Sequence, residues 1–427
     1  MLEPGEQMLF RRLGVFVGGF TLRSAEMVCS FGDRTVADIS AEVESLLDKS
    51  VLGRASAPPR EYRFTMLETI REYSIEQLET SGEADTLRRR HADHFLGIAE
   101  EADRHLHSIG QATYLAQLDR EYDNVRGALG YCQSVTDGGS LALRLVAAVW
   151  RFWLIRGYLS EAHQRLFSVL ARATQSADVG SHAKVVTAAG FLAFFVGDLE
   201  QAVALSEEGV ALSRTAGERW YTALGLNMLG TVARSHGQYS AATRRYEEAL
   251  GIARELGDTW LLAMGLSNLG NIAFVQEQDE GTERMEEGLA LFTEAGDPWY
   301  VAMMLNFVGR VERRRGHYHR SRTLLEESVN VYQQLGNTWG LALCLDAFAC
   351  LAEAQVQPER AGRLLGAEAA MREAVDVPIY PTIRPEHERC LTATRETLGK
   401  DRFAAAWSAG RAMSLEEAVA YALEPER

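Results

Sequence analysis

Two groups of side chains in this sequence have residue types and a spacing that could bind a metal ion or an anionic ligand. The first is the pair His91 and His94, three residues apart in RRRHADHF. On a helix both imidazoles would share one face and could hold a metal ion. No carboxylate or third histidine is placed by spacing to complete a ligand set, so we expect no metal.

The second group is a basic cluster within residues 313–322. Such a cluster is usually the solvated edge of a helix. If it binds a ligand, an acidic protein surface or a phosphate-bearing molecule is the matching chemistry, and Arg313, Arg314 and Arg315 are the candidate binding residues. The other members are Arg320, Arg322, His317 and His319.

Catalytic motifs are missing from the sequence. No GxxxxGK[ST] occurs, so there is no glycine loop to hold a triphosphate. LGKD at Leu398 to Asp401 lacks the first glycine and follows a helix pattern rather than a strand. No GxSxG is present, and no Ser/His/Asp set can be defended. We predict a protein that is not an enzyme and uses no cofactor.

Composition narrows the function classes further. The chain has 427 residues and a formal charge of −15, which opposes nonspecific binding to nucleic acid or to an anionic membrane. Its five cysteines include no pair at CxxC spacing, so they indicate neither a disulfide framework nor a zinc site. No signal peptide and no long apolar run is present. A cytoplasmic protein with reduced thiols is the expectation.

The elements that must position any site come from an internal repeat. Trp220, Trp260, Trp299 and Trp339 follow one another at spacings of 40, 39 and 40 residues. Each period has the pattern of two helices joined by a short turn. Gly237 stands in one of these turns, where glycine favours a left-handed backbone conformation.

The four tryptophans allow two interpretations. Along a concave groove they could stack on a small molecule or grip a peptide. Alternatively, one tryptophan at a fixed phase packs each first helix against the previous unit, which is the interpretation we favour. Asn227, Asn268 and Asn306 lie near the same helices and could donate hydrogen bonds to an extended peptide, although they do not share one phase.

The repeats resemble the tetratricopeptide repeat. The best-matching unit carries that family's positions at Leu229, Gly230, Gly237, Tyr239, Ala242, Tyr246 and Ala249. The usual period is about 34 residues, so these units are longer. After Trp260, Glu277 and Asp279 replace the glycine and the aromatic residue, which predicts a distorted turn. The resemblance implies an all-α fold, a tetratricopeptide superhelix or α-solenoid.

Different segments flank the repeats. Residues 1–80 have the pattern of helices followed by a small hairpin, with a strand in YRFTM, which is typical of a winged-helix-like domain. Residues 81–140 are predicted to be a helical connector. About six repeat units fit within residues 141–371, and residues 372–427 are predicted to form a C-terminal helical cap.

Nearly the whole chain resembles the C-terminal portion of bacterial regulators that join a signal-transduction NTPase to a winged helix and tetratricopeptide repeats. The resemblance rests on LFRRLGVFVGGFTLRSAEMVC, YRFTMLETIREYSIEQLETSGE, RRRHADHFL, LDREYDNVRGAL and WRFWLIRGYLSEA. The NTPase that begins such regulators, and the LuxR-type helix-turn-helix that ends some, are not in this sequence. A fragment, a split gene product and a naturally reduced form all fit this pattern.

The resemblance implies a regulatory sensor. Its repeats would bind a protein, a peptide or a small inducer and couple that event to transcription, through a separate NTPase or transcription component. The alternative is a regulator that binds DNA directly through its winged helix. Residues 1–80 contain nine Lys or Arg and thirteen Asp or Glu, a net charge of −4, whereas a DNA-reading domain normally has a basic face. We therefore expect the winged helix to have a structural role.

Because adjacent repeats bury each other, dividing the chain near Gly257 should leave two weakened halves. Urea unfolding followed by circular dichroism should give each half a lower midpoint and a broader transition than the intact chain. A half that keeps the full midpoint and cooperativity would contradict the repeat interpretation.

Overall fold

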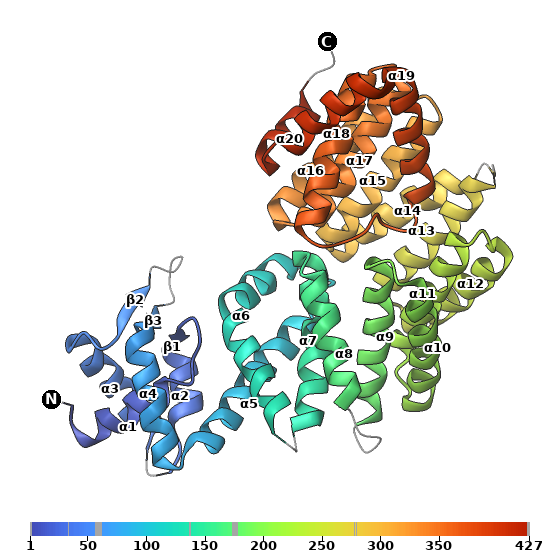
Figure 1. Ribbon diagram of the computed structural model, residues 1–427. Helices are drawn as coiled ribbons and strands as arrows, with labels where there is room; N and C mark the ends of the chain where they lie inside the picture. Colours follow the sequence, from blue (N-terminus) through green and yellow to red (C-terminus); the bar gives the residue numbers. More distant parts are fainter. Residues whose placement is uncertain are drawn as a thin grey trace. The chain divides into compact units, whose positions relative to one another are not determined.

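The computed structural model describes residues 2–32, 34–55, 62–135, 138–172, 178–276, 278 and 280–424. These residues are almost entirely helical (Figure 1), which confirms the predicted all-α class. Glu277 and Asp279, the residues of the predicted distorted turn, lie outside the described residues. In the described part of the chain, no helix has the length and apolar content required to span a membrane.

The N-terminal residues form a winged helix with one small antiparallel sheet. Its elements are α1 (Pro4–Leu13), β1 (Phe20–Thr21), α2 (Leu22–Cys29), α3 (Val36–Asp48), β2 (Gly53–Ala55), β3 (Arg63–Thr65) and α4 (Glu68–Ser81). β3 lies between β1 and β2, with Phe20 opposite Phe64. The strand predicted in YRFTM is therefore β3, and the order of helices and hairpin predicted from the sequence is confirmed.

The rest of the described chain is a succession of helices. α5 (Ala84–Asp103) and α6 (Gln111–Ser134) come first, and six consecutive pairs follow. The pairs are α7 (Gly139–Arg156) and α8 (Leu159–Arg172), α9 (Val179–Phe195) and α10 (Leu199–Ala216), α11 (Arg219–Ser235) and α12 (Tyr239–Leu256), α13 (Thr259–Val275) and α14 (Glu280–Ala295), α15 (Pro298–Arg314) and α16 (Tyr318–Leu335), and α17 (Thr338–Ala354) and α18 (Pro358–Ala374). The last helices are α19 (Arg384–Arg411), bent at Gly399, and α20 (Leu415–Leu423).

The chain divides into two compact units. The first takes residues 1–104, 113–149 and 172–177, so it contains the winged helix, α5 and most of α6. The second takes residues 105–112, 150–171 and 178–427 and contains most of the repeats. Residues 105–112, which connect α5 to α6 and include the first two residues of α6, therefore belong to the second unit; we refer to them as the loop at 105–112.

A buried polar cluster joins α6 to the winged helix inside the first unit. Asn124 accepts a hydrogen bond from the Val17 N–H (2.8 Å) and donates one to the Gly19 carbonyl (2.9 Å). Glu121 accepts a hydrogen bond from Arg63 Nη2 (3.0 Å). The REYDN, VGGF and YRF segments of the sequence thus meet at one place.

Glycines in left-handed conformation end the first helix of several pairs, as predicted. The backbone angle φ is +74° at Gly157, +79° at Gly197, +72° at Gly237 and +80° at Gly316. A residue with a Cβ pays about 1 kcal/mol or more there. The last pair nevertheless turns at Val356, where φ is +60°.

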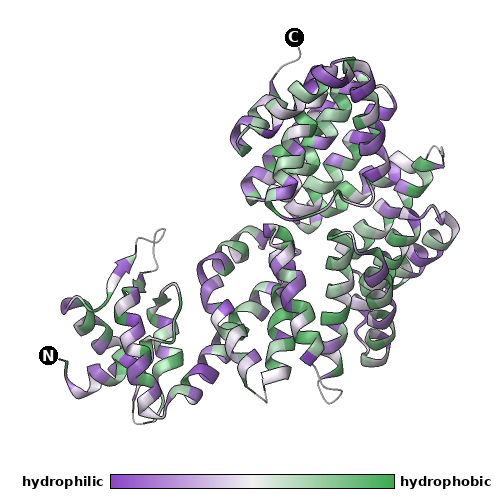
Figure 2. Ribbon diagram, viewed as in Figure 1, coloured by the Kyte–Doolittle hydropathy of each residue, from purple (hydrophilic) through white to green (hydrophobic). Residues whose placement is uncertain are grey.

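The second unit is wound tightly enough for distant repeats to touch. The ring of Phe195, at the end of α9, lies 6.0 Å from that of Trp299 and 5.2 Å from that of Trp339. Asn337 donates a hydrogen bond to the Ile155 carbonyl at the end of α7 (2.6 Å). The first two pairs therefore pack against the last two. Figure 2 shows the apolar character of α9, whose residues 185–195 are all buried.

The connecting segment 375–383, between α18 and α19, runs back across the second unit. Its Tyr380 ring lies 5.2 Å from Phe195 and 5.5 Å from Trp339. Arg234 of α11 donates a hydrogen bond to the Thr382 hydroxyl (3.2 Å). This segment therefore contacts helices of the second, third and sixth pairs.

The closest approach of α11 and α12 gives a test of the packing. A Cβ added at Gly230 would lie 2.5 Å from Cε1 of the buried Tyr246. Gly230→Ala should lower the free energy of unfolding by about 1–3 kcal/mol, because the tyrosine has no room to move. Urea unfolding measures the change.

Gly251→Ala is the matched control. This glycine lies within α12 and has open space around the position of a Cβ. The substitution should raise the free energy of unfolding by about 0.5–1 kcal/mol, because alanine has the higher helix propensity. Equal effects of the two substitutions would contradict the contact between Gly230 and Tyr246.

Candidate ligand pocket among the first helices of the repeats

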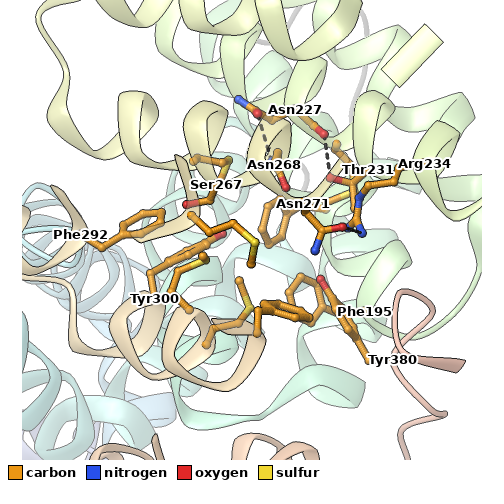
Figure 3. Close-up of a pocket in the computed structure, with 17 residues that line it drawn as sticks. Phe195, Asn227, Thr231, Arg234, Ser267, Asn268, Asn271, Phe292, Tyr300 and Tyr380 are labelled. Atoms are coloured by element: carbon orange, nitrogen blue, oxygen red, sulfur yellow. Dashed lines mark hydrogen bonds between the residues drawn. The ribbon is translucent and has the colours of Figure 1, made fainter. Parts of the chain in front are cut away.

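A pocket in the second unit is lined mainly by the first helices of four successive pairs, α9, α11, α13 and α15 (Figure 3). Its cavity volume is about 60 Å³, which becomes about 630 Å³ when the space open to solvent is included. The remaining wall comes from α14 and from Tyr380. Since consecutive repeats supply the walls, the pocket exists only while the repeats are stacked.

One side of the pocket is polar (Figure 3). Asn268 Nδ2 donates to Asn227 Oδ1 (3.3 Å), and Arg234 Nη1 donates to Asn271 Oδ1 (2.8 Å). The structure therefore brings together Asn227 and Asn268, two of the asparagines noted in the sequence. Arg234 and Asn271, which also line the polar side, were not among the candidates identified from the sequence. Each stands at helical spacing from a noted asparagine, seven residues after Asn227 and three after Asn268, and that spacing could have found them.

Apolar and aromatic side chains form the rest of the pocket wall. In Figure 3, Phe292 and Tyr300 lie across the pocket from Arg234. The full set of apolar and aromatic lining residues is Phe191, Phe195, Met228, Met264, Met285, Phe292, Tyr300, Met303, Met304, Phe307 and Tyr380. Methionine side chains adapt their shape to a ligand. An apolar wall facing a few convergent polar groups is the usual composition of a small-molecule site.

The four tryptophans are not among the residues described as lining this pocket. Trp260, Trp299 and Trp339 are at most 4% exposed, and Trp220 is partly exposed. The rings of Trp220 and Trp260 stack at 5.4 Å, and those of Trp299 and Trp339 at 6.0 Å. The protein itself covers the rings of Trp260, Trp299 and Trp339, so a ligand that stacked on them would have to displace neighbouring side chains.

Asn306 lies in a buried polar network rather than in the pocket. It accepts a hydrogen bond from Arg310 Nε (2.8 Å), and Arg310 also pairs with Asp346 (2.9 Å) and Glu386 (3.0 Å). Burial by itself would raise the pKa of Asp346, but Arg310 and His387 hold this pKa below its ordinary value. The network ties the start of α19 to α15 and α17, and it leaves no face of Asn306 for a peptide.

The three candidate arginines of the basic cluster contact this protein's own side chains. The partners of the three candidate arginines are Glu386 for Arg313, the Phe274 ring at 4.8 Å for Arg314, and Glu312 at 3.7 Å for Arg315. A phosphate bound at Arg313 or Arg315 would compete with those carboxylates.

His91 and His94 have different neighbours. His91 Nε2 lies 3.4 Å from Asn124 Oδ1, and burial lowers the pKa of His91 to about 3. His94 Nε2 lies 3.1 Å from Ser24 Oγ. Over the ranges that the structure describes, no three His, Cys, Asp or Glu residues are grouped to hold a metal ion.

A second polar cluster surrounds Asp297, at the start of α15. Asp297 is fully buried and pairs with Arg151 of α7. It also accepts hydrogen bonds from Gln111 Nε2 (2.8 Å) and Trp260 Nε1 (2.8 Å). Arg151 Nε donates to the Leu106 carbonyl (3.0 Å). The cluster thereby fixes the loop at 105–112 to the first, fourth and fifth pairs.

Comparison with protein families identifies both parts of the chain. Residues 2–79 match the family described as winged helix-turn-helix domain. Residues 184–255 and 301–335 match families described as tetratricopeptide repeat. The chain joins a winged helix-turn-helix domain to tetratricopeptide repeats, so the two resemblances drawn from the sequence are confirmed. Both families are regulatory or binding domains rather than catalytic ones.

Curated relatives match part of the chain. It is similar to proteins named "Putative HTH-type transcriptional regulator" from Mycobacterium tuberculosis and Mycobacterium bovis. The identity is 32% over 172 residues, which are 40% of this chain and 19% of each relative. The match therefore spans about a fifth of the length of these relatives.

Two solved structures are also similar. One is a Rap protein complexed with competence and sporulation factor, at 11% identity, with 79% of this chain and 94% of that chain covered and a TM-score of 0.47. The other is a signal transduction ATPase with numerous domains and a tetratricopeptide repeat sensor from Pyrococcus horikoshii. It has 14% identity, with 96% of this chain and 63% of that chain covered and a TM-score of 0.44.

The Asp297 cluster generates a stability prediction. Asp297→Asn would leave Arg151, which is 2% exposed, without its counter-charge. The free energy of unfolding should fall by about 3–5 kcal/mol, as measured by urea unfolding.

Asp258→Asn tests the same position one repeat earlier. Asp258 caps α13 and accepts a hydrogen bond from Trp220 Nε1 (3.0 Å), and within the described chain no arginine pairs with it. Asparagine caps helices about as well as aspartate, so this change should cost less than about 1 kcal/mol. A similar cost at both positions would show that the pair with Arg151 is not what stabilises the cluster.

Proposed function

We propose that this protein is a non-catalytic regulatory module. Its repeats bind a partner or an inducer in the pocket lined by α9, α11, α13 and α15, and binding is coupled to transcriptional regulation. The pocket carries this proposal, because it presents amides and one cation opposite an apolar wall. The name of the mycobacterial relatives supports the link to transcription.

The winged helix favours a protein-binding or structural role over direct DNA binding. α3, the second helix of the helix-turn-helix, has the sequence VADISAEVESLLD, which contains four acidic residues and no Lys or Arg. DNA recognition depends on basic side chains at the phosphates. Arg63 of β3 is buried in an ion pair with Glu121, so it is not available to a phosphate either.

The loop at 105–112 offers a route for the coupling. Asp297 begins α15, one of the pocket helices, and holds Gln111 directly and Leu106 through Arg151. The same loop continues into α5 and α6 of the first unit. A ligand that shifts α15 would therefore act on this loop and, through the chain, on the unit that contains the winged helix.

The test is affinity capture from a lysate of the source cells with the purified full chain, with and without ATP and duplex DNA, followed by mass spectrometry. We expect the chain to retain an NTPase or a transcription component. Asn268→Trp, which fills the polar side of the pocket, should lose that protein. Asn330→Trp, on the exposed side of α16, is the matched control and should retain it.

Two results would overturn the proposal. Equal capture by the original chain and the Asn268→Trp variant, with both folded by circular dichroism, would remove the pocket from the function. Retention of duplex DNA that disappears at moderate salt would support the alternative, a regulator acting through its winged helix.

A further inference from the structure

The pocket contains a single formal charge. Of its described lining residues, Arg234 is the one that is charged at neutral pH. In the described part of the chain, no carboxylate oxygen lies within 4.0 Å of the Arg234 guanidinium. The buried Arg310, by contrast, pairs with two carboxylates.

Neutral groups position the Arg234 guanidinium without neutralising it. Nη1 donates to Asn271 Oδ1 (2.8 Å) and Nη2 donates to Thr382 Oγ1 (3.2 Å). Nε is buried and has no hydrogen-bond partner among the described residues. A half-buried cation without a counter-charge loses part of its hydration, and an anionic ligand would compensate that loss.

The remaining walls accommodate a hydrocarbon rather than a second charge. Met264 and Met303 present thioethers, and Phe292 and Tyr300 present rings on the side away from Arg234 (Figure 3). A chain or ring that fills this space would bury apolar surface while its head group reached Arg234. The pocket therefore matches a molecule with one anionic end and one apolar body.

The connecting segment 375–383 favours a compact ligand over an extended peptide. Tyr380 forms part of the pocket wall and packs on Phe195 (5.2 Å) and Trp339 (5.5 Å). Pro378 lies so close to Gly197 that a Cβ there would be 2.9 Å from Pro378 Cγ. A peptide running along the first helices would meet this segment, whereas a small molecule would stop short of it.

We propose that the ligand is a small apolar carboxylic acid whose carboxylate pairs with Arg234 and whose hydrocarbon body lies against the methionines and aromatic rings. This inference rests on the proposed function, since it names the chemical class of the inducer for the same pocket.

The experiment is calorimetric titration of the full chain with octanoate and with octan-1-ol, which share a hydrocarbon length and differ in charge. We expect one octanoate per chain, bound at least about tenfold more tightly than octan-1-ol. Arg234→Gln keeps hydrogen-bond donors but removes the charge, so it should bind the two probes alike. Arg244→Gln, at an exposed position on α12, should keep the preference for octanoate.

Absence of saturable octanoate binding, or an unchanged preference in a folded Arg234→Gln variant, would overturn the assignment of a carboxylate. The proposed function would survive that result if Asn268→Trp still abolished capture of the partner. If Asn268→Trp left capture unchanged while octanoate bound through Arg234, the pocket would be a ligand site without the proposed regulatory role.

Discussion

The buried pair between Asp297 and Arg151 joins the first helix pair to the fifth, whose first helix forms part of the pocket wall. A carboxylate and a guanidinium removed from water are stable only while they remain paired and hydrogen-bonded. Because Arg151 lies on the first helix pair and Asp297 on the fifth, the pair holds two distant repeats at one separation. The apolar contacts of Phe195 with Trp299 and Trp339 join the second helix pair to the fifth and sixth pairs. The first helices between these contacts are thereby bent around a common hollow.

The presence or absence of an ion pair also distinguishes arginines that stabilise the fold from arginines that are candidates for binding a ligand. The protein is acidic, and basic side chains such as Arg310 and Arg313 form ion pairs with its own carboxylates. Such matched residues hold elements together and have little left for a ligand. Arg234 differs because its partners among the described residues are neutral. The proposed ligand is for this reason centred on Arg234 rather than on the densest cluster of like charge.

The winged helix illustrates why a fold and its surface are considered separately. Its described residues form the helices and the three-stranded sheet, and α6 adds a buried cluster in which Asn124 and Glu121 hold Gly19 and Arg63. The segments that carried the family resemblance thus have a structural explanation. The α3 helix, by contrast, presents acids where a DNA-reading helix needs bases. The fold places this domain in a family, but its surface decides what it binds.

The sequence by itself determined the local structure: the helix pairs, the glycine turns such as Gly237, and the helices and hairpin of the winged helix. These follow from short-range periodicity and from backbone preferences, which neighbouring residues fix. The tertiary structure alone decided which side chains meet. Asn227 and Asn268 face the pocket whereas Asn306 is enclosed by Arg310, and Tyr380 reaches the pocket from a segment outside the repeats. The reason is that superhelical curvature accumulates from small rotations between repeats and is fixed by long-range contacts, neither of which residue spacing encodes.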